Sequence, residues 1–256
     1  YEIASCLVGS EMCIRDSNTY GSVNFVDPTG IQLVPNKTII DAPASSALAY
    51  INYQYKDDDM AQIEQTKKLP VTLLQDPVYL KRLDCLTTTL PEETKTVSIY
   101  SLGERDALVW GNNKYLILAP TILLKKGTTS ENLSTELLNH RLTLYYLSAE
   151  GDEDANTLKL YLRYEISGIG GSSTEETDDK ESWASDYNVR YTNVSHVNLQ
   201  PIISMYKSTH SGSEPEKVTV EYEYNNSTSS IPTIAKKQTK TCLLYTSDAA
   251  DEARSV

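Results

Sequence analysis

Alternation of apolar and polar residues with a period of two dominates the middle of the chain and predicts β-strands. The pattern is strongest in Arg141–Ser148 and Thr157–Ile166. In the second segment every even-numbered position from Leu158 to Ile166 is apolar, whereas the odd-numbered positions are mostly polar. Because successive side chains of a strand point to opposite faces, one face of this strand is predicted to be buried.

These two segments are predicted to pair as an antiparallel hairpin. The expected register places Leu144 opposite Leu162 on the core side and Tyr145 opposite Tyr161 on the other face. A shift by one residue would turn every leucine toward water, so the hydrophobic pattern should fix the register.

Further strands are predicted wherever β-branched and aromatic residues alternate with polar ones. In chain order they are Ser22–Val26, Ile31–Val34, Thr38–Ile40, Ala47–Tyr55, Thr96–Leu102, Ala107–Trp110, Lys114–Leu118, Ile122–Leu124, Tyr187–Leu199, Ile202–Tyr206, Val218–Tyr224 and Ile231–Thr241. The connection Gly111–Asn113 predicts a hairpin turn, since both Gly and Asn tolerate left-handed backbone angles.

Short helices are favoured in two places, and a third segment is left open. Asp59–Lys67 follows a run of aspartates, and negative charge suits the start of a helix. Pro77–Thr87 follows Asp76, so an N-cap residue precedes a proline at the first helical position. The segment Ser130–Asn139 is open between a helix and a loop.

Many strands at short intervals, with a few short helices, predict an all-β fold of mainly antiparallel strands. A β-sandwich is the expected architecture, and a jelly roll is one such arrangement. The chain has 256 residues, which is long enough to bury a sizeable core. We expect one β-rich domain over residues 18–241, as a fragment of a longer protein.

The two ends of the chain have sequences of a different kind. Cys6–Ser17 reads Cys-Leu-Val-Gly-Ser-Glu-Met-Cys-Ile-Arg-Asp-Ser, and Cys242–Glu252 reads Cys-Leu-Leu-Tyr-Thr-Ser-Asp-Ala-Ala-Asp-Glu. Both strings resemble the conceptual translation of a sequencing adapter. The resemblance implies that residues 1–17 and 242–256 are artefactual tails outside the fold. The alternative is that they are two ordinary polar tails.

The charge of the chain narrows the range of partners. Asp and Glu number 35 against 23 Lys and Arg, which gives a formal net charge of −12. So negative a surface repels phosphate groups, and nucleic acid is therefore not an expected partner. No apolar run approaches the roughly 20 residues of a membrane-spanning helix, so membrane insertion is not expected.

Residue types that often carry catalysis are sparse and unfavourably spaced. Cys85 is the one cysteine outside the two tails, so no disulfide framework is predicted, and a buried thiol is expected there. His140, His196 and His210 do not have the spacing of zinc ligands or of a nucleophile–base pair. We therefore predict no catalytic residue and no cofactor.

One loop has the spacing of a metal site. Asp152, Asp154 and Asn156 resemble the opening of an EF-hand calcium loop, whose clustered oxygens suit a hard cation. However, Thr157 stands where that loop needs glycine, and Arg163 stands where it needs glutamate. These departures favour a solvated hairpin tip over a calcium site.

Tyrosine is by far the most frequent aromatic residue of this sequence, with 18 Tyr against 2 Trp and a single Phe. We expect an exposed aromatic face that stacks on sugars or contacts proteins, made of Tyr145, Tyr161, Trp183, Tyr187 and Tyr191. The alternative is that these rings fill half-buried sheet positions, for which Tyr has a high propensity.

Together these patterns predict a non-enzymatic structural or assembly protein, which associates with itself or with other structural proteins. A component of a viral or phage virion is the most specific form of this hypothesis. The alternative is an extracellular module that binds carbohydrate (a glycan partner) or mediates adhesion. A third hypothesis is the β-rich accessory part of an enzyme whose catalytic part lies outside the fragment. A virion or an extracellular location follows from the first two.

Overall fold

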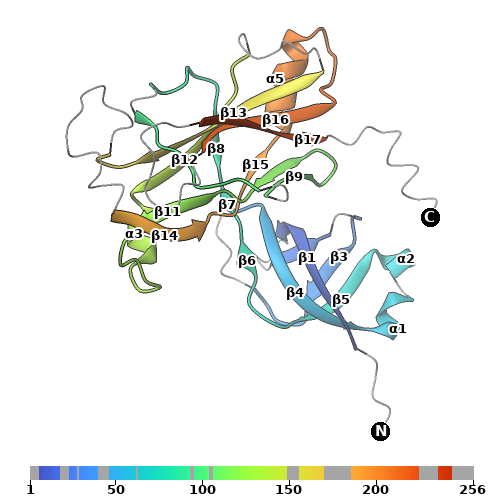
Figure 1. The fold of residues 1–256 in the computed structure, drawn as a ribbon. Helices are drawn as coiled ribbons and strands as arrows, with labels where there is room; N and C mark the ends of the chain where they lie inside the picture. The colour runs from blue at the N-terminus through green and yellow to red at the C-terminus, as the bar shows by residue number, and fades with distance from the viewer. Residues whose placement is uncertain are drawn as a thin grey trace. The chain divides into compact units, whose positions relative to one another are not determined.

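A computed structural model of the chain confirms the all-β class (Figure 1). The structure describes residues 6–17, 23–27, 29–39, 46–61, 63–92, 95–103, 106–148, 156–169, 186–224 and 236–243. These residues form strands in several sheets, joined by a few short helices. Within those ranges no helix is both long and apolar enough to cross a membrane.

The chain divides into two compact units, Tyr1–Arg82 and Leu83–Val256, which we call unit 1 and unit 2. Each unit buries an apolar core of its own, and the two cores share no residue. The prediction of a single domain over 18–241 was therefore wrong. Alternation along a strand shows which face is buried, but it does not show which core that face joins.

Unit 1 is a small barrel. Its elements are β1 (Cys6–Ser17), β2 (Val23–Val26), β3 (Gln32–Pro35), β4 (Leu48–Lys56), α1 (Asp57–Met60), α2 (Ile63–Thr66), β5 (Lys68–Leu73) and β6 (Val78–Tyr79). The strand order β1-β2-β3-β5-β4 closes on itself because β1 also pairs with β4. The strands β3 and β5 are parallel, and the other barrel pairs are antiparallel. This connectivity is that of the five-stranded Greek-key barrel known as the OB-fold.

Unit 2 contains a five-stranded sheet with the order β17-β16-β13-β12-β8. The strands are β8 (Asp84–Leu86), β12 (His140–Tyr145), β13 (Thr157–Ile166), β16 (Lys217–Tyr224) and β17 (Lys236–Leu243). The predicted hairpin is confirmed, since Leu144 lies opposite Leu162 and Tyr145 opposite Tyr161. The pairs β8–β12 and β13–β16 are parallel. They distinguish this sheet from a jelly roll, in which neighbouring strands are antiparallel.

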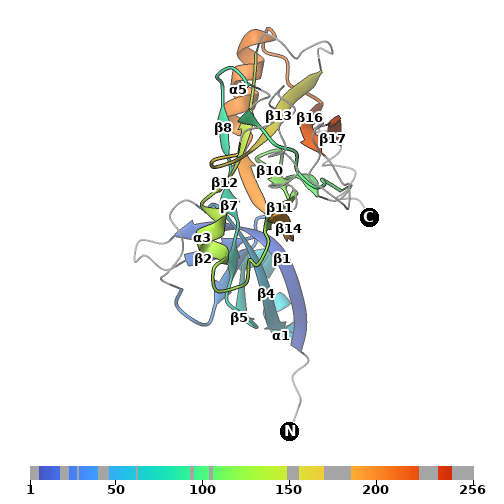
Figure 2. The same cartoon turned by 60° about the vertical axis from the view of Figure 1, so that its left-hand side comes forward.

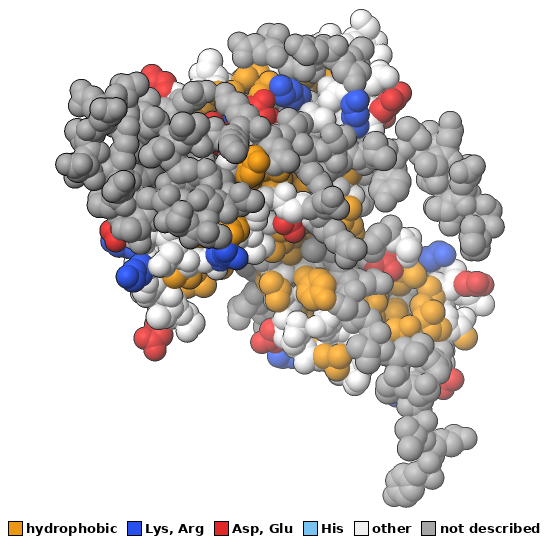
Figure 3. All heavy atoms as spheres, in the orientation of Figure 1, with side chains coloured by type: hydrophobic (Ala, Val, Ile, Leu, Met, Phe, Trp, Pro, Cys, Tyr) orange, Lys and Arg blue, Asp and Glu red, His pale blue; other side chains and the backbone are white. Residues whose placement is uncertain are grey.

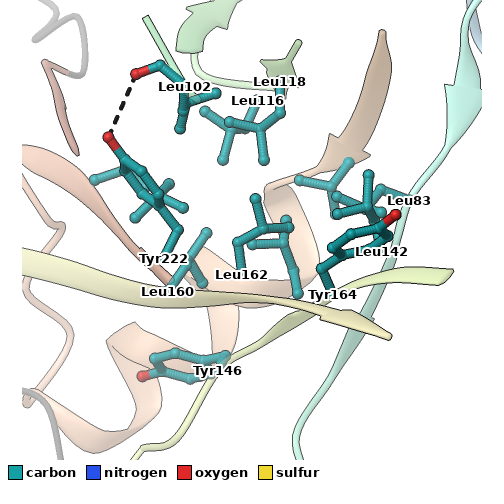
Figure 4. Packing of buried hydrophobic residues seen from close by; sticks show 14 of the residues in the cluster. Leu83, Leu102, Leu116, Leu118, Leu142, Tyr146, Leu160, Leu162, Tyr164 and Tyr222 are labelled. Carbon is teal, nitrogen blue, oxygen red and sulfur yellow. Dashed lines mark hydrogen bonds between the residues drawn. The ribbon is translucent and has the colours of Figure 1, made fainter. Parts of the chain in front are cut away.

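The short strand β7 (Lys81–Arg82) is the last element of unit 1. In unit 2, the strands β15, β10 and β9 lie side by side in a second sheet, and β11 and β14 form a two-stranded ribbon (Figure 2). The elements are β9 (Ala107–Trp110), β10 (Tyr115–Leu118), β11 (Thr121–Lys125), α3 (Leu133–Leu137), β14 (Tyr187–Thr192), β15 (Ser195–Asn198) and α5 (Gln200–Thr209). The core of unit 2 lies between these elements and the five-stranded sheet. Figure 4 shows Leu160 and Leu162 of β13 pointing into the same interior as Leu116 and Leu118 of β10.

In two segments the structure has strands where a helix was predicted, or a helix where a strand was predicted. The segment Pro77–Thr87 contains the strands β6, β7 and β8 instead of a helix, because Leu80 and Leu83 each reach a core from extended backbone. The segment Ile202–Tyr206 belongs to helix α5 instead of a strand. The spacing of its two buried isoleucines and Tyr206 follows one helix face, and a proline lies at the helix start.

The other short predictions agree in part. Thr96–Leu102 forms isolated β-bridges at Val97, Ile99 and Ser101 instead of a strand, and in the predicted strand Thr38–Ile40 neither Thr38 nor Ile39 is in a strand. The predicted strand Tyr187–Leu199 divides into β14 and β15. Helices α1 and α2 lie in and beside the predicted segment Asp59–Lys67, and α3 lies within Ser130–Asn139. In the predicted turn, Gly111, Asn112 and Asn113 all have positive φ angles. That backbone conformation is available to Gly and Asn at little cost, which is why this sequence forms a hairpin between β9 and β10.

The two ends do not lie outside the fold as predicted. Cys6–Ser17 forms β1, which is paired with β2 and β4, and Cys242 and Leu243 are the last residues of β17. The prediction of detached tails is therefore wrong for these residues. Strand pairing uses backbone groups that every residue has, so a β-compatible sequence of any origin can occupy such an edge. That these residues are adapter read-through stays a prediction.

Candidate functional site

The aromatic face predicted from the sequence is not an exposed platform. Tyr145 and Tyr161 lie opposite each other as predicted, but they are only 7% and 6% exposed. Tyr187 and Tyr191 are half-buried and pack against the core of unit 2, and Trp183 lies outside the described residues. The half-buried sheet positions that formed the alternative interpretation therefore describe these rings better.

The ring of Tyr161 is already used by two cations of its own strand. The Lys159 Nζ atom lies 5.0 Å from the ring centroid, and the Arg163 guanidinium carbon lies 5.5 Å from it. Cations favour the face of an aromatic ring, so these contacts are stabilising. They also leave little of the ring for a sugar to stack on, which is the physical reason for the correction.

Arg163 is the centre of a buried ionic network on the same face of the five-stranded sheet. Its side chain is 4% exposed, and its Nη2 atom lies 2.8 Å from Glu221 Oε1. Its Nε atom lies 3.8 Å from Glu223 Oε1, and Thr96 donates a hydrogen bond of 2.8 Å to the other oxygen of Glu223. Lys159 contacts Glu221 at 3.5 Å. Two cations thus balance two carboxylates, as a buried charge requires.

A second buried polar cluster joins α3, β12 and β13. His140 Nε2 lies 3.0 Å from Glu136 Oε1, and its Nδ1 atom shares a hydrogen bond with the Tyr164 hydroxyl. Since an ionised carboxylate only accepts, Nε2 is the donor to Glu136. The Lys125 amide also donates to Glu136 at 3.0 Å, and Tyr164 reaches the Leu123 carbonyl at 3.5 Å. The cluster therefore connects the sheet to β11.

The pKa values of this cluster reflect its surroundings. Burial raises the pKa of Tyr164 well above its usual value, and the nearby Tyr187 and Glu136 act in the same direction. Burial alone would also raise the pKa of Glu136, but hydrogen bonds from His140 and from the Lys125 amide outweigh it and lower the pKa. A neutral tyrosine beside an ionised carboxylate is therefore the stable state near pH 7.

The other candidate nucleophile and bases have structural surroundings. Burial raises the pKa of the Cys85 thiol to about 12, so its thiolate is scarcely populated at neutral pH. His196 is buried, and its ring meets Tyr115 edge to face. The ring of His210 stacks on Tyr206 with the centroids 3.9 Å apart. These three side chains serve the packing of unit 2.

The predicted metal loop is largely outside the described part of the chain. Asp152 and Asp154 are not described, and Asn156 is an exposed residue in the turn before β13. Nowhere in the described ranges do three His, Cys, Asp or Glu side chains come together as metal ligands would. The calcium hypothesis stays a prediction.

The ribbon of β11 and β14 attaches to unit 2 by one face. In β11, Ile122 and Leu124 are fully buried. In β14, the odd-numbered residues pack against the same core: Tyr187, Val189 and Tyr191. The ribbon is therefore amphipathic, and its inner face fixes it to the rest of the unit.

The outer face of β14 carries polar side chains, of which Arg190 and Thr192 are exposed. The Arg190 guanidinium carbon lies 4.3 Å from the centroid of the Tyr100 ring. Thr192 Oγ1 lies 3.1 Å from Oγ1 of Thr121 across the ribbon. Both side chains are held by a neighbour, which gives this face a defined shape.

Backbone hydrogen bonds show which way β14 presents its polar groups. The Thr121 amide donates to Ser101 at 2.9 Å, so the backbone groups of Thr121 point away from β14. Thr192 lies directly opposite Thr121. In an antiparallel pair, two residues opposite each other either both point their backbone groups toward the partner strand or both point them away from it. The backbone groups of Thr192 therefore point to the outer edge of β14. Two residues earlier, those of Arg190 do the same. Asn193, next in the chain, points inward and donates to the residue before β11.

Arg190 is the one charged side chain of β14. Lys125, Lys126 and Arg190 are all exposed, and exposed Asp186 and Glu131 and the half-buried Glu136 lie near them in the chain. Figure 3 shows Lys and Arg side chains beside the corner of unit 2 where Figure 1 draws β11 and β14. A strand edge with which no described residue pairs, polar groups in fixed places and the exposed cation of Arg190 make this ribbon the candidate functional site.

The sequence pattern does not indicate this site. It assigns Tyr187 and Tyr191 to an exposed aromatic face and predicts Ile122–Leu124 only as one further strand. The alternation in Tyr187–Thr192 was a usable signal, because the polar set contains a single cation, Arg190. What the sequence did not contain is the partner of that strand, which lies some 65 residues earlier in β11.

Comparisons with known proteins bear on the fold. No family model matches the sequence, and no curated protein matches it. A crystal structure of a candidate lipoprotein from Bacteroides fragilis has a TM-score of 0.71 and 21% identity, and the alignment covers 94% of this chain and 99% of that chain. A protein from Parabacteroides merdae has a TM-score of 0.55 and 13% identity, with 93% and 100% of the two chains covered.

A third structure, of a protein of unknown function from Bacteroides vulgatus, has a TM-score of 0.53 and 13% identity, and covers 94% of this chain and 92% of that chain. At these identities the likeness concerns the fold. The chain therefore shares its all-β fold with proteins of Bacteroides and Parabacteroides.

Proposed function

We propose that this chain is a non-enzymatic assembly protein, which binds another polypeptide by adding one strand of that partner to the outer edge of β14. The observation that carries the proposal is the outward orientation of the backbone groups of Arg190 and Thr192. Among the described residues, none pairs with that edge. Unpaired backbone groups along a strand are a ready template for another chain.

The ribbon is suited to strand addition because it is already ordered. Its inner face packs on the core through buried Ile122 and Leu124, so binding requires no folding of β14. A preformed binding surface avoids the entropic cost of ordering a segment on association. The entropic cost of ordering then arises from the partner strand alone.

Three other described edge strands are less suitable. The edge strands β6 and β8 have two and three residues, too few for a stable added ladder. The edge strand β17 is longer, but its sequence contains Lys236, Lys237 and Lys240. Lysines along an edge are a common means of preventing pairing. The edge of β14 has six residues and one cation, Arg190.

The side chains that could support catalysis have other tasks in this structure, which favours binding over enzymatic activity. Arg163 is held by two buried carboxylates, His140 is held between Glu136 and Tyr164, and the pKa of Cys85 is raised. The setting that we favour is a bacterial cell surface, by analogy with the Bacteroides fragilis neighbour described as a candidate lipoprotein. A virion component, as predicted from the sequence, would use the same edge for assembly.

A neutral strand peptide tests the proposal. We expect acetyl-Thr-Val-Thr-Val-Thr-Val-Thr-amide, at up to about 1 mM, to shift the amide NMR signals of Arg190 and Thr192 and to slow their hydrogen exchange. The R190P variant should lose this response, because proline removes the outward amide while β11 pairing does not use that group. R190A keeps the amide and should retain binding.

Unchanged signals at Arg190 and Thr192, or peptide binding that R190P leaves intact, would overturn the proposal. The oligomeric state gives a second measurement. A dimer in solution that R190P dissociates supports strand addition, with a second copy of the chain as the partner.

A further inference from the structure

We infer that the strand accepted by β14 has an acidic side chain opposite Arg190 and apolar, β-branched side chains on both sides of that acidic residue. This inference rests on the proposed function above and names the chemistry of the partner. It follows from three properties of β14: where its cation is held, what charge surrounds it and how its other face is covered.

The cation is held in place before any partner arrives. The Arg190 side chain is exposed, and its guanidinium group lies over the Tyr100 ring at 4.3 Å. In an antiparallel pair, residues directly opposite each other place their side chains on the same face. The residue opposite Arg190 would therefore have its side chain beside a positioned guanidinium, where a carboxylate forms the favourable cross-strand pair.

The surrounding charges leave Arg190 as the deciding group. Lys125 and Lys126 are exposed at the end of β11, but three carboxylates lie near them in the chain: exposed Asp186, exposed Glu131, and Glu136, which accepts a hydrogen bond from the Lys125 amide at 3.0 Å. Arg190 is the one charged side chain of β14 itself. The preference for an acidic residue therefore comes from the cross-strand pair with Arg190.

The residues that flank the acidic side chain meet a different surface. In an added strand they would lie on the inner face, beside Val189 and Tyr191. Those two side chains are only half-buried and already pack against the core of unit 2. Apolar β-branched residues would cover their exposed parts and extend that core by one strand. The accepted pattern is therefore apolar–acidic–apolar.

A second copy of this chain fits the edge poorly. If β14 paired with another β14, the residues available opposite Arg190 would be Asn188, Thr192 or Arg190 itself. None of these carries a negative charge, and Arg190 opposite Arg190 is repulsive. A different polypeptide that presents a glutamate or an aspartate is therefore the better partner.

Three matched peptides test the inference on the full chain. They share the sequence acetyl-Thr-Val-X-Val-X-Val-Thr-amide, with Glu, Lys or Thr at both X positions. We expect the Glu peptide to bind up to about fivefold tighter than the Lys peptide, which is the upper size of one cross-strand charge pair. In R190E the order should reverse, and about 1 M salt should reduce the difference in both proteins. The melting temperature of R190E serves as the check that this exposed substitution leaves the fold intact.

The possible outcomes separate the two proposals. Equal binding of all three peptides, with loss of binding in R190P, would keep strand addition and overturn the acidic preference. An acidic preference that R190E leaves unchanged would also overturn the inference, because another cation would then be responsible. If none of the three peptides binds, strand addition itself fails.

Discussion

Replacing Arg163 by methionine tests whether the buried ionic network is balanced as its geometry indicates. In the wild-type chain Arg163 is 4% exposed and contacts Glu221 at 2.8 Å and Glu223 at 3.8 Å. Methionine fills a similar volume without charge or hydrogen-bond donors. In R163M the two carboxylates would keep only Lys159 as a cation, at 3.5 Å from Glu221.

The expected loss follows from the burial of the carboxylate that is left behind. Glu223 is 5% exposed, and after the substitution it would keep only the 2.8 Å hydrogen bond from Thr96. Breaking a buried pair by removing one partner costs about 3–5 kcal/mol, because the remaining charge is uncompensated. We therefore expect R163M to lower the free energy of unfolding of unit 2 by that amount at pH 7.

The same reasoning gives the sign of one further change. The double variant R163M/E223Q should be more stable than R163M at pH 7, because the glutamine side chain carries no charge to leave uncompensated. Replacement of both partners of a buried pair is often close to neutral.

Tryptophan fluorescence during urea unfolding measures these differences in unit 2 alone. Both tryptophans, Trp110 and Trp183, lie in the sequence of that unit. The matched control is K95M, which breaks the exposed pair Lys95–Glu92 and should change the free energy of unfolding by less than about 1 kcal/mol. If R163M costs no more than K95M, or if E223Q gives no recovery in the double variant, the network does not carry a buried charge.

Three further predictions concern the buried groups of unit 2. Y164F should lower the free energy of unfolding by about 1–3 kcal/mol, because it leaves a His140 nitrogen without its hydroxyl partner. Above pH 10 tyrosine ionises in the unfolded chain, whereas buried Tyr164 resists ionisation, so the wild type loses stability there. Urea titrations should show a smaller loss in Y164F. The lowered pKa of Glu136 stabilises the fold above about pH 4, so the stability difference between the wild type and E136Q should shrink as the pH falls below that value. Cys85 should resist alkylation at pH 8 until urea unfolds unit 2, as mass spectrometry of its peptide would show; alkylation in the native state would contradict its raised pKa.

The hairpin of β12 and β13 could be predicted because local information fixes it. Five apolar residues at alternate positions fix which face of β13 meets the apolar core, so the register of its pairing cannot shift by one residue. Leu144 and Leu162 therefore met as expected. The same argument could not place β16 beside β13, because that parallel pair joins residues some 60 positions apart.

The prediction failed where a short segment satisfied two patterns. In Pro77–Thr87 a proline after an aspartate suggested a helix start, but the segment forms three short strands, and Leu80 and Leu83 between them are buried. In Ile202–Tyr206 the apolar residues fit a strand as well as a helix, and the buried set of α5 shows that the helical spacing decides. Tertiary contacts selected the structure in both segments.

The candidate site was harder to predict than the fold for a related reason. Tyr145 and Tyr161 looked like surface residues because their positions are on the polar face of the hairpin, yet they are buried. Alternation separates two faces of a strand, but what covers the second face depends on distant segments. The position of β14 at an edge depends likewise on pairing that no local pattern contains.

Arg163 and Arg190 show the physical difference between the buried network and the proposed binding edge. Each is the arginine on the polar face of its strand. Arg163 lies in a central strand, and its carboxylates come from the next strand, where Glu221 and Glu223 alternate in step with it. Arg190 lies in an edge strand, and among the described residues its charged group contacts a ring, Tyr100, rather than a carboxylate. A glutamate on a partner strand would be a carboxylate partner for Arg190, as the glutamates of β16 are for Arg163. Charge and backbone pairing therefore indicate the same kind of partner.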